Sequence, residues 1–163
     1  MLKIRNFRSE EWRLYKALRL RSLRDAPDAF GSTWARESPR PDEEWMARLS
    51  DVDDRSSFPV VAFGDDEPVG LAWGRIEAAA PERADLYQMW VSPDYRGRGV
   101  GRRLLDAVLH WASERTEYMV LGVTLGNDRA LALYESAGFQ AFGEPEELRP
   151  GSDKLVQSMK RDF

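Results

Sequence analysis

The chain has 163 residues, of which 42% are hydrophobic and 32% are charged. These proportions are typical of a globular protein, and the length suits one domain, so we expect a single domain over residues 1–163. No apolar run approaches the roughly 18 residues that a membrane helix needs. The charged segment Met1–Arg5 lacks the pattern of a secretory signal, which favours a cytoplasmic protein that does not bind membranes.

Charge and residue counts exclude several kinds of site. With 24 Lys and Arg against 28 Asp and Glu the net charge is −4, so non-specific binding to nucleic acid is not favoured. The chain has no cysteine and one histidine, which excludes thiolate nucleophiles and zinc sites built from Cys and His ligands. That histidine, His110, has no nucleophile beside it and is expected at the surface of a helix. The chemistry must therefore come from the backbone, carboxylates and tyrosine.

The first half of the chain predicts a strand, two helices and a hairpin. Leu2–Phe7 alternates apolar and polar residues, as a strand does. Ser9 is expected to cap a helix that ends near Arg24. Turn residues, helical spacing and apolar runs then predict a loop over Asp28–Arg40, a helix over Pro41–Leu49 with proline in first position, and strands over Phe58–Phe63 and Val69–Ile76 joined by Gly64, Asp65 and Asp66.

The second half alternates strands and helices. By the same criteria its elements are a strand over Leu86–Val91, a helix over Gly99–Ser113, a strand over Tyr118–Val123, a helix over Asp128–Ala137, a strand over Phe139–Phe142, a hairpin loop over Gly143–Asp153 and a strand over Leu155–Met159. The whole order is βααβββαβαββ. It predicts an α/β (α+β) fold with a mixed central sheet and helices on both faces.

The strand that ends at Val91 is followed by a glycine-rich junction with a helix. Backbone amides at a helix N-terminus are unpaired and the helix dipole adds positive charge there, so such a junction can bind phosphate. Three glycines leave room for the phosphate to approach these amides: Gly97, Gly99 and Gly101. Four arginines add positive charge nearby: Arg96, Arg98, Arg102 and Arg103. A glycine-rich turn with solvated arginines remains the plain structural alternative.

Two common phosphate loops fit this junction badly. A Walker loop needs a Lys followed by Ser or Thr, and neither is present. A dinucleotide-binding fingerprint needs a glycine where Arg102 stands. A phosphate-loop nucleotide hydrolase is therefore disfavoured.

The pattern Arg96-x-x-Gly99-x-Gly101, preceded by a strand and Pro93, resembles the acyl-CoA binding motif of the GNAT superfamily of N-acetyltransferases. The segment Asn127–Phe139, with its Asn, its helical Tyr134 and its Gly-Phe end, is similar to a later motif of that superfamily. The order of elements also resembles the family fold. The resemblance covers nearly the whole chain and is detailed from Asp85 to Phe139.

The resemblance implies an activity and a set of binding residues. The implied reaction moves an acetyl group from acetyl-CoA, a co-substrate, to a primary amine of a small molecule or peptide, by direct attack in a ternary complex and without metal. A bacterial enzyme and a homodimer are also implied. The implied cofactor contacts are the backbone of Met89 and Val91 for the pantetheine arm and thioester, the amides of Arg98, Gly99, Val100 and Gly101 with the neighbouring Gly97 for the pyrophosphate, Arg96 and Arg102 for the phosphates, Asn127 for the arm and Tyr134 for the sulfur.

Two catalytic roles follow from the same resemblance. Tyr134 would protonate the departing thiolate, although it also lies on an apolar helical face and could be a core tyrosine. Asp85 stands where some family members carry a general-base Glu, and the alternative is a solvated carboxylate at a strand edge. Glu77 and Glu37 are weaker candidates, and some members work without a dedicated base.

The acceptor is the least defined part of the prediction. Trp34, Trp45, Trp73 and Trp90 lie on elements that border the acceptor cleft in this fold, where aromatic rings could hold an amine. For most of them, core packing or a dimer surface is the favoured explanation. A non-catalytic acyl-CoA sensor of the same fold is the alternative function.

Overall fold

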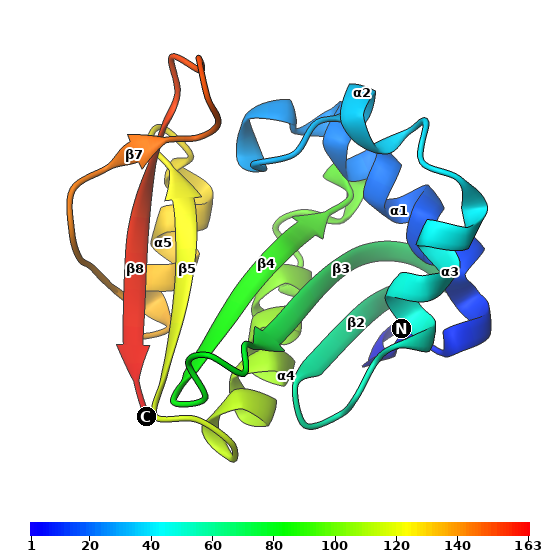
Figure 1. The fold of residues 1–163 in the computed structure, drawn as a ribbon, viewed down its shortest axis with the longest axis horizontal. Helices are drawn as coiled ribbons and strands as arrows, with labels where there is room; N and C mark the ends of the chain where they lie inside the picture. The colour runs from blue at the N-terminus through cyan, green and yellow to red at the C-terminus, as the bar shows by residue number, and fades with distance from the viewer.

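The computed structural model describes residues 1–163 as one mixed sheet with helices on both faces (Figure 1). The strand order is β1-β2-β3-β4-β5-β8-β6, with β7 beside β8, and β4–β5 is the one parallel pair. The strands are β1 (Leu2–Asn6), β2 (Ser57–Gly64), β3 (Glu67–Ile76), β4 (Arg83–Val91), β5 (Tyr118–Thr124), β6 (Gln140–Ala141), β7 (Glu146–Glu147) and β8 (Leu155–Asp162). The helices are α1 (Trp12–Asp25), α2 (Trp34–Glu37), α3 (Asp42–Ser50), α4 (Val100–Ser113) and α5 (Asp128–Ser136), with 3₁₀ turns at Ser9–Glu11, Pro27–Ala29 and Pro93–Tyr95.

Both faces of the central strands are buried because helices cover each side. Val60 packs in a core with residues of α4 and α5, whereas its neighbour Val61 packs in a second core with residues of α1 and α3. A strand buried on both faces reads as a continuous apolar run, which is the pattern of β2. The predicted α/β architecture is confirmed.

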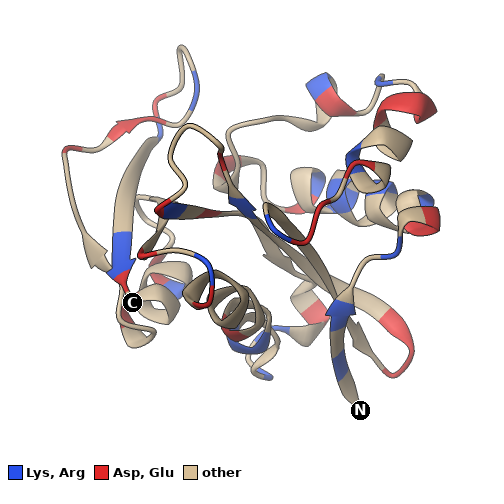
Figure 2. Ribbon diagram, turned by 60° about the horizontal axis from the view of Figure 1, so that its bottom comes forward, with Lys and Arg blue, Asp and Glu red and all other residues tan.

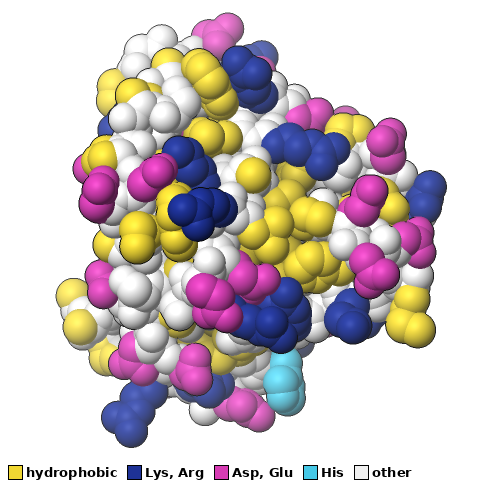
Figure 3. All heavy atoms as spheres, turned by 90° about the vertical axis from the view of Figure 1, so that its right-hand side faces the viewer, with side chains coloured by type: hydrophobic (Ala, Val, Ile, Leu, Met, Phe, Trp, Pro, Cys, Tyr) yellow, Lys and Arg dark blue, Asp and Glu magenta, His cyan; other side chains and the backbone are white.

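The predicted hairpin and long helix are also confirmed. Asp65 and Asp66 join β2 to β3, both with positive φ (52° and 68°), as a tight two-residue hairpin requires. In α4 the apolar residues at helical spacing are all buried, and His110 is exposed as expected, 3.4 Å from Glu114 (Figure 3).

Three details of the N-terminal third differ from the prediction. Ser9 does not cap α1, because Ser9–Glu11 forms a 3₁₀ turn in which the Glu11 carboxylate accepts from the Arg8 amide at 2.7 Å. The expected loop Asp28–Arg40 contains a 3₁₀ turn and helix α2, whose N-cap Thr33 accepts from an amide one turn on. Pro41 precedes α3 as its N-cap, with extended backbone.

The C-terminal region contains one strand that the sequence did not indicate. Within the expected loop Gly143–Asp153, the two residues of β7 pair with the start of β8. The full order thus has one helix, α2, and one strand, β7, more than predicted. Both are too short to show a period in the sequence.

Charge is mixed over the molecule. Figure 2 shows Lys and Arg interspersed with Asp and Glu on the same elements. None of the helices is both long and apolar enough to span a membrane.

Candidate active site

Strands β4 and β5 separate after a short paired stretch (Figure 1). They pair only from Arg83 with Tyr118 to Asp85 with Val120. Beyond these pairs β4 continues to Val91 beside β3, while β5 continues to Thr124 beside β8. The sheet therefore opens into a slot between two of its central strands.

A bulge in β4 lies beside this slot. Trp73 pairs with Tyr87, and Leu71 pairs with Trp90, so Gln88 and Met89 together oppose one residue of β3. Gln88 has a φ of 59°, and its side-chain oxygen accepts from the Tyr15 hydroxyl at 2.7 Å. A bulge bends its strand and increases the twist, which turns β4 away from β5.

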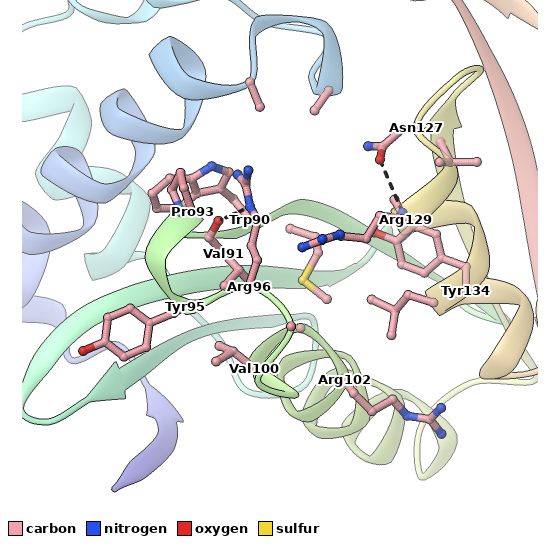
Figure 4. Close-up of a pocket in the computed structure, with 18 of the residues that line it drawn as sticks. Trp90, Val91, Pro93, Tyr95, Arg96, Val100, Arg102, Asn127, Arg129 and Tyr134 are labelled. Carbon is pink, nitrogen blue, oxygen red and sulfur yellow. Dashed lines mark hydrogen bonds between the residues drawn. The ribbon is translucent and has the colours of Figure 1, made fainter.

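A cleft of about 990 Å³ occupies the slot and extends over the glycine-rich loop (Figure 4). We call it the large cleft. It is lined by the end of β4, the loop, the start of α4, the end of β5 and one face of α5. The predicted cofactor residues that line it are Met89, Val91, Arg96, Gly97, Gly99, Val100, Gly101, Arg102, Asn127 and Tyr134. Arg98 is the one that does not.

The glycine-rich loop presents free amides to this cleft. Helix α4 begins at Val100, and no protein atom accepts a hydrogen bond from the amides of residues 97–102. Gly97 and Gly99 have φ of 76° and 81°, a left-handed conformation that glycine adopts without strain. A Cβ at either position would meet nothing within 4 Å. The loop is therefore an open anion site at a helix N-terminus.

The loop is held in place by the protein itself. The Ser92 amide donates to the Val69 carbonyl at 2.7 Å, and Arg21 donates to the Ser92 hydroxyl at 2.7 Å. The Tyr95 ring packs where Gly64 has no side chain, since a Cβ there would lie 2.5 Å from the ring. The site is thus formed before any ligand arrives.

Two of the predicted phosphate-binding arginines have partners in the protein. Arg96 donates to the Val91 carbonyl at 3.0 Å (Figure 4) and also to the Asp25 carboxylate at 2.6 Å. Burial alone would raise the pKa of Asp25, but hydrogen bonds from Trp90 and Arg96 lower it below its usual range. Arg102 pairs with Asp106 on the next turn of α4 at 2.9 Å. Both line the cleft with part of their charge already neutralised.

Two other arginines differ from the prediction: Arg98 does not line the cleft, whereas Arg129 does. The Arg98 guanidinium lies over the Tyr95 ring, 4.9 Å from its centroid. Arg129, which the sequence analysis missed, extends from the first turn of α5 into the cleft and forms no ion pair (Figure 4). Its position two residues after Asn127, in the later motif, was the signal available in the sequence.

Asn127 and Tyr134 lie on the α5 side of the cleft. Asn127 caps α5, since its side-chain oxygen accepts from the Ala130 amide at 3.3 Å, which leaves its NH₂ group free. The Tyr134 side chain is buried and packs edge-on against Phe139, yet its hydroxyl makes no hydrogen bond within the protein. Burial raises the pKa of Tyr134 well above its usual value, so the hydroxyl stays protonated at neutral pH.

A second cavity of about 440 Å³ meets the large cleft, and we call it the small pocket. It lies among β4, β5, β7, β8 and the segment that follows α1. The five residues that line both cavities define the junction: Ala29, Met89, Gly122, Thr124 and Tyr134. Two ligands, one in each cavity, can therefore touch beside Tyr134.

The carboxylates named as candidate bases lie away from this junction. Asp85 accepts from Arg83 at 2.6 Å, and Glu77 pairs with Arg75 at 3.0 Å. Both line a third cavity of about 360 Å³, which adjoins the small pocket through shared residues such as Tyr87 and Gly122. Glu37 lines none of the three cavities, and both its oxygens are bound by arginines.

Three of the four tryptophans considered for the acceptor cleft belong to the core. Trp45, Trp73 and Trp90 are buried together with residues of α1 and α3. Trp90 also lines the large cleft and donates to Asp25 at 2.9 Å. Trp34 is partly exposed, and Arg24 stacks on its ring. The small pocket is instead lined by residues for which the sequence predicted no role, among them Arg19, Gln88, Glu146 and Glu147.

Comparison with known proteins agrees with this geometry. The model of the acetyltransferase (GNAT) family matches residues 12–139. N-alpha-acetyltransferase RimI of Mycobacterium tuberculosis is 39% identical over 88 residues, which cover 54% of each chain. Mycothiol acetyltransferase of Propionibacterium freudenreichii is 42% identical over 74 residues, 44% of this chain and 23% of that protein. The chain spans about half or less of the length of the curated relatives it matches.

The fold has a close structural counterpart. The crystal structure of a GNAT superfamily phosphinothricin acetyltransferase from Sinorhizobium meliloti in complex with AcCoA superimposes with a TM-score of 0.81 at 19% identity, over 99% of this chain and 88% of that one. The family match covers most of the chain, and the strand order, the separated strands and the glycine-rich loop are all in place. The chain therefore belongs to the acetyltransferase (GNAT) family.

Proposed function

We propose that the protein transfers an acetyl group from acetyl-CoA to a primary amine, by direct attack within a ternary complex. The observation that carries this proposal is the junction of the two cavities between the separated strands β4 and β5. One cavity offers free amides for a diphosphate, the other has the size of a small-molecule site, and they share Met89 and Tyr134.

Acetyl-CoA would occupy the large cleft. Its diphosphate would accept hydrogen bonds from the amides of residues 97–102, with added positive charge from Arg96, Arg102 and Arg129. The pantetheine arm would run along Met89 and Val91 in the place of the missing neighbouring strand, and the free NH₂ of Asn127 would donate to it. The thioester would then reach the junction.

The reaction needs two proton movements. The neutral amine attacks the thioester carbonyl, a C–N bond forms and the C–S bond breaks; one proton leaves the attacking nitrogen, and the sulfur must take up a proton or a hydrogen bond. Tyr134 would supply it, because its hydroxyl is protonated, lies at the junction and has no other partner.

The ammonium of the acceptor must first lose a proton. Asp85 would receive it through the third cavity, which adjoins the small pocket. If so, Asp85→Asn lowers kcat/KM by about 10²-fold at neutral pH, whereas Glu77→Gln in the same cavity has little effect. An unchanged rate in Asp85→Asn would assign deprotonation to solvent.

The relatives indicate the range of acceptors and settings. The names of the two relatives described above are N-alpha-acetyltransferase and mycothiol acetyltransferase, and a peptide amine and a small-molecule amine are both within the proposal. A cytoplasmic location and a homodimer are part of the same proposal. Sedimentation of the purified protein measures the latter.

Calorimetric titration with acetyl-CoA tests the cofactor site. Gly99→Ala forces a side chain into the left-handed region at the free amides, and we expect acetyl-CoA to bind at least about tenfold more weakly. Gly143→Ala is the matched control, since Gly143 also has positive φ and open space around it but lies outside the cleft. If folded Gly99→Ala and the wild-type protein bind acetyl-CoA with equal affinity, the diphosphate does not bind at this loop. Release of CoA in the presence of amines separates an enzyme from an acyl-CoA sensor.

A further inference from the structure

Arg19 is a buried arginine without a carboxylate partner. Its side chain comes from the middle of α1, is 5% exposed and lines the small pocket. The guanidinium makes one long hydrogen bond, from Nη1 to the Ser22 hydroxyl at 3.4 Å, and Nε makes none. It forms no salt bridge, although a buried charge is costly unless it is paired.

Glu37 is the carboxylate that interacts electrostatically with Arg19, and two other arginines already bind it. Glu37 accepts from Arg40 at 2.7 Å and from Arg48 at 2.9 Å, one arginine on each oxygen. Burial lowers the pKa of Arg19, and the negative charge of Glu37 offsets this only in part. This side of the small pocket therefore carries an excess of positive charge.

Packing accounts for the position of Arg19 but not for its unpaired donors. The guanidinium stacks on the Phe30 ring, 4.6 Å from its centroid, and Phe30 also lines the pocket. Stacking holds the plane of the guanidinium and leaves its N–H groups at the edge free. A planar set of free donors fits a carboxylate, which accepts two parallel hydrogen bonds from arginine.

A second donor lies in the same pocket. The Gln88 side-chain oxygen is taken by the Tyr15 hydroxyl, so the remaining Gln88 group is an NH₂. Arg19 and Gln88 both donate and cannot accept in this arrangement. The β4 bulge places Gln88 there, next to Met89 at the junction.

The opposite charge lies across the pocket. Glu146 and Glu147 of β7 line it and form no ion pair, while Arg19 comes from α1 on the other side of the separated strands (Figure 1). The two glutamates favour the entry of a molecule that carries an ammonium group, and Arg19 favours one that also carries a carboxylate. The pocket volume of about 440 Å³ limits it to a small molecule.

We propose that the acceptor is a free amino acid or a close analogue, whose carboxylate binds Arg19 and Gln88 while its amine faces the junction at Met89 and Tyr134. The N-terminus of a polypeptide carries an uncharged amide at the corresponding place, which could accept a hydrogen bond but would leave the charge of the arginine without an anionic partner. This inference rests on the proposed acetyl transfer for the orientation of the amine, and it names the acceptor class.

Binding measured without turnover tests the anionic subsite. The ligands are the N-acetyl derivatives of the common amino acids, the products of the proposed reaction, each paired with its carboxamide, which has nearly the same shape but no negative charge and only one accepting oxygen. Calorimetric titrations are run with and without CoA. For the preferred side chain we expect the acid to bind about ten- to a hundredfold more tightly than its amide.

Variants identify Arg19 as the source of that preference. Arg19→Met removes it and leaves the affinity for the amide nearly unchanged, while Arg19→Lys keeps part of it. Arg13→Met, on the exposed side of the same helix, is the control and retains the full preference. Arg19→Met also keeps or gains stability to denaturant, because it removes a buried charge that no carboxylate compensates.

The outcomes separate the two proposals. Equal binding of acids and amides to the wild-type protein, binding of neither series, or a preference that survives Arg19→Met overturns the amino-acid acceptor. A preference for acids that depends on Arg19, without CoA release from acetyl-CoA and the matching amino acid, would leave the anionic subsite standing and refute the proposed acetyl transfer. CoA release with uncharged amines alone would do the reverse.

Discussion

At the scale of single residues, the proposed role of Tyr134 as the acid can be tested most directly. If its hydroxyl protonates the departing sulfur, Tyr134→Phe lowers kcat by about 10²-fold and leaves the affinity for acetyl-CoA nearly unchanged. Because burial raises the pKa of Tyr134, its deprotonation does not limit the rate below about pH 10. Rapid-mixing assays of CoA release give kcat, and Tyr118→Phe, outside both cavities, is the control. Equal kcat in Tyr134→Phe and wild type would make it a packing residue.

Asp25 links the pH dependence of stability to the cleft. It accepts from Arg96 and Trp90, and its pKa is lowered in the folded state. A lowered pKa means that its contribution is complete above about pH 4, the usual value for aspartate, and is lost as the pH falls through the pKa of the folded state. We expect Asp25→Asn to cost about 1 kcal/mol of unfolding free energy at pH 7. Urea titrations should show this difference shrinking below about pH 4; a constant difference down to pH 2 would contradict the assignment.

Residue types in local motifs were predictable, whereas their partners were not. The positive φ of Gly97 and Gly99 follows from a loop that must turn into a helix, and sequence spacing carries that information. The pairing of Arg96 with Asp25 joins positions 71 residues apart. Arg19 lacks a carboxylate partner because Arg40 and Arg48 bind Glu37 in the folded structure. Such contacts are set by packing between elements, so the sequence could not indicate which arginines remain free.

At the scale of elements, the bulged end of β4 depends on close backbone contact with β3. A Cβ at Gly70 would lie 2.8 Å from the Trp90 carbonyl oxygen, a backbone atom that cannot rotate away. We expect Gly70→Ala to cost about 1–3 kcal/mol, as overpacking does. Chemical denaturation measures this. Gly31→Ala, where the nearest atom is 3.8 Å away and φ is not positive, should be neutral. Similar stability of the two variants would show that β3 and the bulged end of β4 can move apart to accept a methyl group.

Elements with a clear period were predicted and those set by their neighbours were not. The apolar spacing of α4 and the two apolar runs of the hairpin identified these elements. By contrast, β7 exists only because β8 offers an edge, and α2 needs the Thr33 cap. The separation of β4 from β5 could not be read from the residues, since neither strand carries a local mark of where pairing ends.

At the scale of the whole molecule, the two cavities meet where β4 and β5 separate. The residues shared by the two cavities include no cysteine or histidine, and the Thr124 hydroxyl donates to the Asp28 carbonyl at 2.6 Å. A nucleophile with an adjacent base is therefore missing where an acetyl-enzyme would have to form. We therefore expect the proposed acetyl transfer to take place between two substrates bound at the same time.

This arrangement predicts sequential kinetics. Double-reciprocal plots of rate against acetyl-CoA at several concentrations of the amine should intersect, because both cavities must be filled before the C–N bond forms. In the absence of the amine, labelled CoA should not exchange into acetyl-CoA, since no acetyl-enzyme returns the group. The exchange assay is the sharper measurement, because it needs only the occupant of the large cleft. Parallel plots together with exchange at a rate near kcat would show that the acetyl group is first transferred to the protein. The two substrates would then bind in turn and would not meet at the junction beside Tyr134.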